Sequence, residues 1–145
     1  MNQLRLTVSY QPKQFIHGCL NWQQNLGIDM TNNVVLRLRD DYGVIGQLCV
    51  QYGEEALTGL TEAWIFCFAI HPEMRGNGIG TDFLQLAERW INKNLRPDYI
   101  KLHAQKEFED ILIPFYMNRG YKFLARDPKC RNEAILVKAP SKIYN

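Results

Sequence analysis

The residues that carry the clearest chemistry lie in a glycine-rich turn over residues 70–81. The turn reads Ile-His-Pro-Glu-Met-Arg-Gly-Asn-Gly-Ile-Gly-Thr. Its three alternating glycines let the backbone turn sharply with the N–H groups pointing inward, and a helical pattern starts directly afterwards. A helix N-terminus has unpaired N–H groups and a positive dipole end, so the turn predicts an anion site, most often for phosphate. Arg75 adds a charged donor and Thr81 a hydroxyl.

Two common nucleotide sites do not fit this turn. A dinucleotide fingerprint, G-x-G-x-x-G, needs glycine at position 81 or 83, where the chain has Thr81 and Phe83. A Walker A loop needs Gly-Lys followed by Ser or Thr, and the chain has no such step. A tight glycine turn without a ligand stays open as the alternative interpretation.

The elements around the turn are predicted from periodicity. Residues 62–70 are apolar on both faces, which is typical of a central strand, and residues 83–95 repeat with helical spacing. Residues 99–104 form the next strand, and residues 108–119 form a helix that ends at Gly120. In the strand over residues 62–70, alternation of side chains places Glu62 and Trp64 on one face with Phe66 and Phe68.

The rest of the chain predicts a mixed α/β domain. The further predicted elements are a strand over 4–8, a helix from Pro12 to Gly27, a hairpin over 34–39 and 44–51, and late strands over 121–125 and 134–138. The 145 residues are 46% hydrophobic and 22% charged, with a net charge of +2. This composition excludes disorder and predicts a single domain over residues 1–145.

Composition also limits the compartment and the partners. The four cysteines lack metal-ligand spacing, so we expect free thiols in a reducing compartment and no metal. The chain has no apolar run long enough to span a bilayer and no signal-peptide core, so we expect a cytoplasmic protein with no membrane partner. Residues 119–145 carry seven basic and two acidic groups. They form either a solvated end or a patch for a polyanion, although the near-neutral total argues against nucleic acid.

Two segments resemble a known family. Arg75 to Gly80 matches the pattern Arg/Gln-x-x-Gly-x-Gly/Ala of the acyl-CoA pyrophosphate loop in the GNAT N-acetyltransferase superfamily. Residues 115–121, Phe-Tyr-Met-Asn-Arg-Gly-Tyr, resemble the late Phe/Leu-Tyr-x-x-x-Gly-Phe/Tyr motif of the same family. The two motifs occur in the family's order, and the resemblance covers roughly residues 62–124.

The resemblance implies a fold and a co-substrate. The fold would be a mixed, largely antiparallel twisted sheet of six to seven strands with helices on both faces, and the strands at 62–70 and 99–104 would splay apart. Acetyl-CoA would enter this gap as co-substrate, with its pantetheine arm on backbone groups of Phe68 and Ile70. The residues expected around its pyrophosphate are Arg75, Gly76, Asn77, Gly78, Gly80 and Thr81.

The resemblance also implies roles for a few side chains. Tyr116 matches the tyrosine that protonates the departing thiolate, a general acid. The base that deprotonates the amine stays open between Glu62, His103, a water relay and no dedicated base at all. Pro114, in a segment longer than that of related members, would break or kink the helix before Tyr116.

The implied activity is acetyl transfer to a primary amine of a small molecule or protein, through direct attack in a ternary complex. Glu54 and Glu55 could attract a cationic amine. The alternatives are a non-catalytic acyl-CoA-binding module and a tRNA-directed acetyltransferase of the toxin type. Dimers through late strands are common in the family, so the resemblance allows a homodimer.

Overall fold

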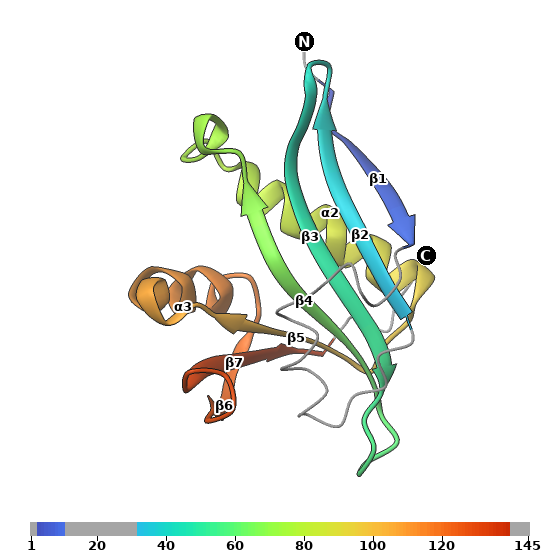
Figure 1. The fold of residues 1–145 in the computed structure, drawn as a ribbon, viewed down its shortest axis with the longest axis vertical. Helices are drawn as coiled ribbons and strands as arrows, with labels where there is room; N and C mark the ends of the chain where they lie inside the picture. Colours follow the sequence, from blue (N-terminus) through green and yellow to red (C-terminus); the bar gives the residue numbers. More distant parts are fainter. Residues whose placement is uncertain (1–2, 11–31, 140–145) are drawn as a thin grey trace.

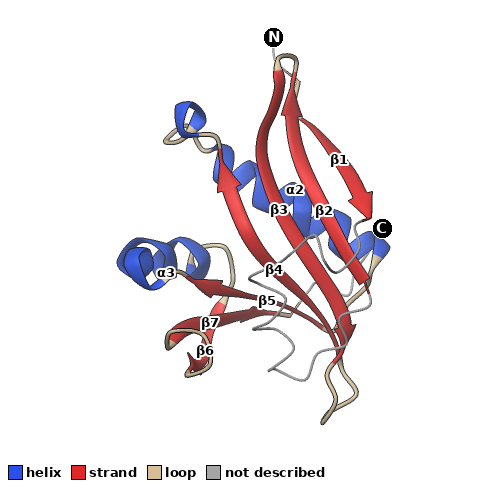
Figure 2. Ribbon diagram, in the orientation of Figure 1, coloured by secondary structure: helices blue, strands red, loops and turns tan. Residues whose placement is uncertain are grey.

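The computed structural model describes residues 3–10 and 32–139 as one seven-stranded sheet with two α-helices (Figures 1 and 2). The strands are β1 (Arg5–Tyr10), β2 (Asn32–Asp40), β3 (Gly43–Glu54), β4 (Thr61–Ile70), β5 (Tyr99–Ala104), β6 (Lys122–Asp127) and β7 (Glu133–Lys138), and the helices are α2 (Ile79–Asn94) and α3 (Glu109–Met117). Short 3₁₀ turns, η2 (Pro72–Met74) and η3 (Lys106–Phe108), precede the two helices. The helix predicted from Pro12 to Gly27 lies outside the described residues.

The sheet confirms the predicted fold class. Its strand order is β1-β2-β3-β4-β5-β7-β6. Every neighbouring pair is antiparallel except β4 and β5, which run parallel. Parallel neighbours need a crossover connection, and α2 provides it. The hairpin predicted around residues 40–43 is present, since β2 and β3 pair in antiparallel register on either side of this turn. The Asp40 carboxylate stabilises the turn by accepting hydrogen bonds from the backbone N–H groups of Tyr42 and Gly43.

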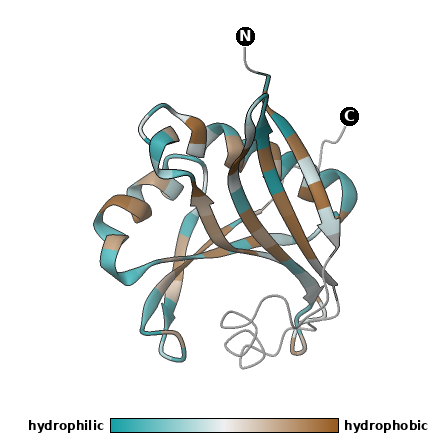
Figure 3. Cartoon of the chain, turned by 45° about the horizontal axis from the view of Figure 1, so that its top comes forward, coloured by the Kyte–Doolittle hydropathy of each residue, from teal (hydrophilic) through white to brown (hydrophobic). Residues whose placement is uncertain are grey.

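Alternating side chains divide the sheet into two buried faces. On the first face, Val34, Leu36 and Leu38 of β2 pack in the main hydrophobic cluster with apolar residues of β3, β4, β5, β7, α2 and α3. On the second face, Val35 and Cys49 form a smaller cluster with Phe66. Apolar residues recur along the central strands and on α3 in Figure 3. None of the helices in the described ranges is long and apolar enough to cross a membrane.

A β-bulge interrupts β4 at Cys67. Three steps along β4, from Phe66 to Ala69, oppose two steps along β3, and Cys67 has a positive φ of 55°. The extra residue reverses the alternation, so Phe68 packs with the first-face cluster. The prediction that Phe68 shares a face with Glu62 and Trp64 was therefore wrong, because simple alternation does not allow for an inserted residue.

The bulge lies where β4 and β5 separate. Their parallel register covers only residues 62–65 of β4 and 99–102 of β5. Beyond Ile65, β4 stays paired with β3, whereas β5 continues along β7. Figure 1 shows the two arrows diverging from a shared base. The expected splay between these strands is therefore present.

Candidate active site

The glycine-rich turn connects β4 to α2 in the predicted strand–turn–helix order. Gly76 and Gly78 have left-handed φ values of 87° and 76°, and a Cβ atom added to either would meet nothing within 4 Å. Gly78 is also the N-cap of α2, without a side-chain hydrogen bond to the first turn. The backbone is thus shaped as an open cradle in front of a helix N-terminus, as an anion site requires.

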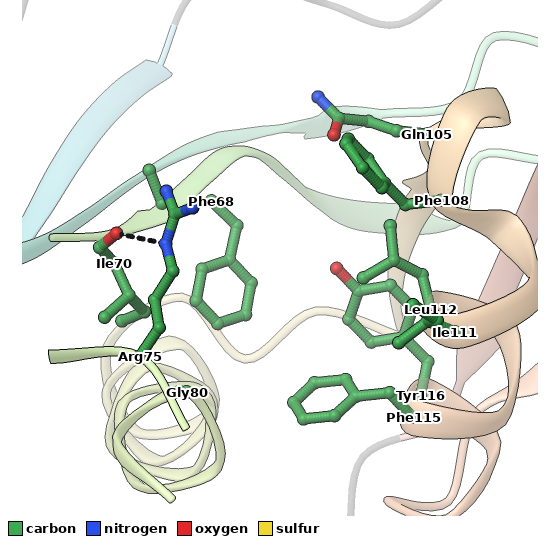
Figure 4. Close-up of a pocket in the computed structure, with 11 residues that line it drawn as sticks. Phe68, Ile70, Arg75, Gly80, Gln105, Phe108, Ile111, Leu112, Phe115 and Tyr116 are labelled. Carbon is green, nitrogen blue, oxygen red and sulfur yellow. Dashed lines mark hydrogen bonds between the residues drawn. The ribbon is translucent and has the colours of Figure 1, made fainter. Parts of the chain in front are cut away.

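Arg75 extends from this turn across the end of β4. Its Nε atom donates a hydrogen bond of 2.9 Å to the carbonyl oxygen of Ile70 (Figure 4). Of the backbone groups expected to contact a ligand at Ile70, the carbonyl oxygen therefore already accepts one hydrogen bond, and its second lone pair is the one left for a ligand. The Nη1 and Nη2 groups of this exposed guanidinium are further donors that an anion can use.

A pocket of about 500 Å³ occupies the gap between the end of β4 and α3 (Figure 4). The lining includes Phe68, Ile70, Arg75, Gly80 and Tyr116 of the predicted site, together with Ala69, Gln105, Phe108, Ile111, Leu112 and Phe115. The structure thus brings residues 36 positions apart along the chain, Gly80 and Tyr116, to one cavity. Gly76, Asn77 and Gly78 lie on the turn before α2, and Thr81 lies in the first turn of α2. None of the four lines the pocket.

Tyr116 lies in the pocket wall with its ring buried and its hydroxyl turned toward the cavity (Figure 4). The side chain is held edge-on by Phe115 and Tyr121, at centroid distances of 5.3 and 5.9 Å. Its hydroxyl makes no hydrogen bond within the described ranges. Burial raises the pKa of Tyr116 to about 12, so the phenol stays protonated at neutral pH.

The segment before Tyr116 does not displace it. The additional residues form η3, and α3 continues through Pro114. The predicted break of the helix at Pro114 is wrong, because α3 is continuous from Glu109 to Met117. Asp110, whose carbonyl would accept from residue 114 in a regular helix, is exposed, so this carbonyl can bond to water instead.

Arg119 is a site residue that the sequence analysis did not identify. Its Nε atom lies 3.1 Å from the hydroxyl oxygen of Thr81, its Nη1 atom donates to the Phe115 carbonyl at 2.8 Å, and its guanidinium lies over the Phe115 ring. A positive charge is thereby fixed beside the N-terminus of α2. The only signal in the sequence was a basic residue within the second motif, since the contact with Thr81 depends on the packing of α3 against α2.

Glu62 and Trp64 lie on the second face of β4 and contact β5. The Glu62 carboxylate forms an ion pair with Lys101 and accepts a hydrogen bond of 3.1 Å from Nε1 of Trp64. Only 5% of the Glu62 side chain is exposed. Both of its oxygens are thus engaged, which leaves this carboxylate poorly placed to accept a proton from a substrate.

His103 lies at the point where the two strands separate. It follows Leu102, the last β5 residue in register with β4. Its ring stacks on Trp64, with the centroids 5.2 Å apart, and its Nε2 atom lies 3.1 Å from Oδ2 of Asp127 on β6. Burial lowers the pKa of His103 below 6.5, although Asp127 acts in the opposite direction. The lowered pKa favours the neutral ring at pH 7. We call Glu62, Trp64, Lys101, His103 and Asp127 the polar cluster.

The two charged segments noted in the sequence are largely engaged within the protein. Glu55 accepts hydrogen bonds from the backbone N–H groups of Leu57 and Thr58 in its own loop. In the basic end, Arg126 pairs with Glu109, Arg131 with Glu107 and Glu133, and Lys138 with Glu88. These contacts give little support to an amine-attracting acidic pair or to a polyanion patch. Lys142 lies outside the described residues.

Comparisons with known proteins agree with this geometry. The family model for the acetyltransferase (GNAT) family matches residues 5–121. An acyl-CoA N-acyltransferase from Pseudomonas aeruginosa superposes with a TM-score of 0.62 at 15% identity, covering 94% of this chain and 100% of that chain. Mutant forms of the spermidine/spermine N-acetyltransferase SpeG from Vibrio cholerae give 0.62 at 16% identity, covering 95% and 96%.

A third structure contains a CoA derivative. Arabidopsis thaliana Naa50, in complex with the bisubstrate analogue CoA-Ac-MVNAL, gives a TM-score of 0.55 at 20% identity, covering 72% of each chain. No curated protein gives a match to this sequence. At these identities the structural comparisons establish the fold alone.

Proposed function

Because this chain belongs to the GNAT family of acetyltransferases, we propose that it transfers an acetyl group from acetyl-CoA to a primary amine by direct attack in a ternary complex. The observation that carries this proposal is the pocket between β4 and α3. It begins beside an open phosphate cradle, follows the free end of a splayed strand and contains a buried tyrosine hydroxyl. A thioester ligand of extended shape fits this arrangement.

The shape, charge and apolar surface of the cleft fit acetyl-CoA, whatever family the chain belongs to. The space beside Gly76 and Gly78 is empty on the side where a Cβ would lie, and Arg75 and Arg119 place two cations near it. Apolar side chains of η3 and α3, Phe108 and Ile111, are more than half exposed, and a bound ligand would cover them. When bound, acetyl-CoA supplies an activated acyl group.

The strand β4 can stabilise the oxyanion that develops on the acyl carbonyl. Its pairing with β5 ends at Ile65, so the next backbone groups on that edge are released from the ladder. The bulge at Cys67 turns the chain locally at this point. A backbone N–H held in this way is a preorganised donor, which costs no rearrangement during the reaction.

We assign the base to His103 rather than to Glu62. The amine must lose a proton before it can attack, and a neutral imidazole can accept that proton at pH 7. His103 lies where the strands separate, whereas both oxygens of Glu62 are held by Lys101 and Trp64. Glu62 would then keep Trp64 in place as the platform on which the imidazole stacks.

Tyr116 then acts as a hydrogen-bond donor to the departing sulfur. Its pKa of about 12 lies well above about 8.5, the ordinary value for a thiol. Full proton transfer from the phenol to the thiolate would be unfavourable at equilibrium by a factor of about 3 × 10³. A hydrogen bond from the phenol stabilises the thiolate without that cost. This refines the general-acid role that the sequence motif suggests.

The acceptor is proposed as a primary amine of a small molecule or of a protein N-terminus or lysine. Of the similar structures, SpeG is by name a polyamine acetyltransferase, and the Naa50 complex holds a peptide-containing analogue. Both support an amine acceptor. The second face of the sheet, where His103 and Trp64 lie, is where we place this amine.

The proposal is tested by ligand binding and by transfer. A ligand at about 100 times its dissociation constant stabilises a protein by roughly 2.7 kcal/mol, so acetyl-CoA and CoA should raise Tm by several degrees, and NAD should not. Acetylation of an amine panel, followed by mass spectrometry, then identifies acceptors. A Tm shift with no transfer to any amine would favour the non-catalytic binding module. The absence of a shift at millimolar acetyl-CoA would contradict the proposal.

Tyr116→Phe tests the role of the phenol. Because the hydroxyl makes no hydrogen bond within the described ranges, we expect an unchanged Tm and an unchanged affinity for CoA. The turnover number kcat should fall about 10- to 100-fold, since one hydrogen bond to the developing charge is lost. An unchanged kcat would remove Tyr116 from the mechanism.

A further inference from the structure

The imidazole of His103 is held on two sides by residues distant in the sequence. Trp64 of β4 stacks on one face of the ring at an interplanar angle of 25°. Asp127 of β6 accepts at the Nε2 edge, at 3.1 Å, and the two paired side chains are only 9% and 4% exposed. A histidine ring fixed by both a face and an edge has little freedom to rotate.

The Asp127 carboxylate is itself fixed by the β6–β7 turn. Its second oxygen, Oδ1, accepts a hydrogen bond of 3.0 Å from the backbone N–H of Lys129. The Asp127 carbonyl accepts from the N–H of Cys130, and the Cys130 carbonyl accepts from Glu133. Both carboxylate oxygens therefore have defined partners, and the hydrogen bond from the turn fixes the orientation of the carboxylate toward the ring.

We propose that Asp127 is the positioning residue for His103, and that the two form a dyad which sets the protonation state of the base. This inference rests on the assignment of His103 as base in the proposed function. With Nε2–H donating to Asp127, the neutral ring carries its lone pair on Nδ1. The proton from the amine nitrogen then goes to Nδ1 and the N–C bond to the acyl carbon forms. The C–S bond of the thioester breaks, and CoA leaves as a thiolate that accepts a hydrogen bond from Tyr116. Asp127 stays ionised beside the imidazolium, which later returns its proton to water or to the departing thiolate.

The charges around the ring explain why such a partner is needed. Burial disfavours the imidazolium, whereas the carboxylates of Asp127 and Glu133 favour it. On the same face, the charge of Lys101 is paired with Glu62. Asp127 favours the imidazolium more strongly than Glu133 does, because it lies within hydrogen-bond distance of the ring, at 3.1 Å. Removing its charge makes the ring a weaker base, because the buried imidazolium loses its main stabilising contact.

The test is the pH dependence of acetyl transfer by Asp127→Asn. The asparagine can still accept the turn hydrogen bond from Lys129, so the fold should be kept. We expect kcat/KM on its pH plateau to fall about 10- to 100-fold, as part of the 10²–10⁴ that a general base contributes. The acidic limb of the profile should move to lower pH by about one unit, a change that a purely structural defect would not produce.

A matched variant separates this effect from the loss of any structural aspartate. Asp98→Asn removes a carboxylate that accepts from the backbone N–H and the hydroxyl of Thr61 at the start of β4, at the other end of β5. We expect Asp98→Asn to keep the wild-type acidic limb even if its Tm falls. A wild-type acidic limb in Asp127→Asn, or an equal shift in Asp98→Asn, would overturn the dyad.

A direct measurement does not depend on activity or on the stability of a variant. Nitrogen-15 NMR of the wild-type protein should show the His103 ring as the neutral Nε2–H tautomer near pH 7. A dominant Nδ1–H tautomer would overturn the dyad, but it would not contradict the proposed acetyltransferase function. Conversely, full activity in His103→Gln would remove the base assignment, and with it the inference, without bearing on the NMR result.

Discussion

The cleft around Tyr116 and the polar cluster around His103 lie on opposite faces of the same splay and follow opposite principles. The cleft leaves its polar groups open: the first N–H groups of α2 and the hydroxyl of Tyr116. The polar cluster closes each group onto a partner, Glu62 onto Lys101 and His103 onto Asp127. Open groups are costly until a ligand satisfies them, so the cleft is built for binding. Partnered groups keep a defined orientation and, for the imidazole, a defined tautomer, which is what a general base needs.

The largest expected effect of this division comes from removing the base. His103→Gln should lower kcat/KM for the amine by about 10²- to 10⁴-fold. Its CoA-induced Tm shift should match that of the wild type, because His103 does not line the cleft. Steady-state rates and thermal denaturation check the two expectations. A variant that loses CoA binding as well would show that the two regions are not separate.

The next effect concerns the stability of the polar cluster. Lys101→Met leaves the Glu62 carboxylate buried without its charged partner, which should lower the free energy of unfolding by about 3 kcal/mol. Urea denaturation measures this loss. Adding Glu62→Gln in the same chain should restore part of it, since the amide still accepts from Trp64 without a charge. No recovery in the double variant would mean that the ion pair is not the source of the loss.

A smaller effect is expected from the cleft. Gly78→Ala places a Cβ in the open space of the cradle at a left-handed φ of 76°, where an L-residue costs about 1–2 kcal/mol. The Kd for CoA, from calorimetry, should rise about tenfold while the KM for the amine stays constant. Gly43→Ala is the control: Gly43 also has a positive φ and open space where a Cβ would lie, but it is the first residue of β3, next to the β2–β3 turn. Its Kd should not change.

The smallest effect is the pH dependence of stability. Because burial lowers the pKa of folded His103 below the 6.5 of the unfolded chain, the folded state binds the proton more weakly. The free energy of unfolding should therefore fall as the pH drops through 6.5, and the loss ends below the folded pKa. The fall in Tm on acidification should be smaller in His103→Gln than in the wild type. Equal falls would contradict the buried, neutral imidazole.

The same division explains what the sequence could predict. The cleft depends on local features, such as glycines at fixed spacing before a helix. The two motifs therefore led to the turn before α2 and to Tyr116 in the pocket wall, while the roles of these residues stay predictions. The polar cluster depends on pairs far apart in the chain, such as His103 with Asp127 and Glu62 with Lys101. No local sequence pattern predicts such contacts. The sequence analysis therefore did not identify Asp127 as the partner of His103, and it did not decide between the candidate bases. The bulge at Cys67 was also missed, because no glycine or other turn residue marks it.

The short seam between β4 and β5 has a consequence for the behaviour of the whole sheet. Four residues of parallel register join one half, β1 to β4, to the other, β5 to β7. Such a seam is the natural boundary between two cooperative folding units, and we expect amide hydrogen exchange to find separate opening energies on its two sides. A ligand in the splay touches both halves. A bound ligand would therefore couple the two halves, so that they unfold and refold as one cooperative unit.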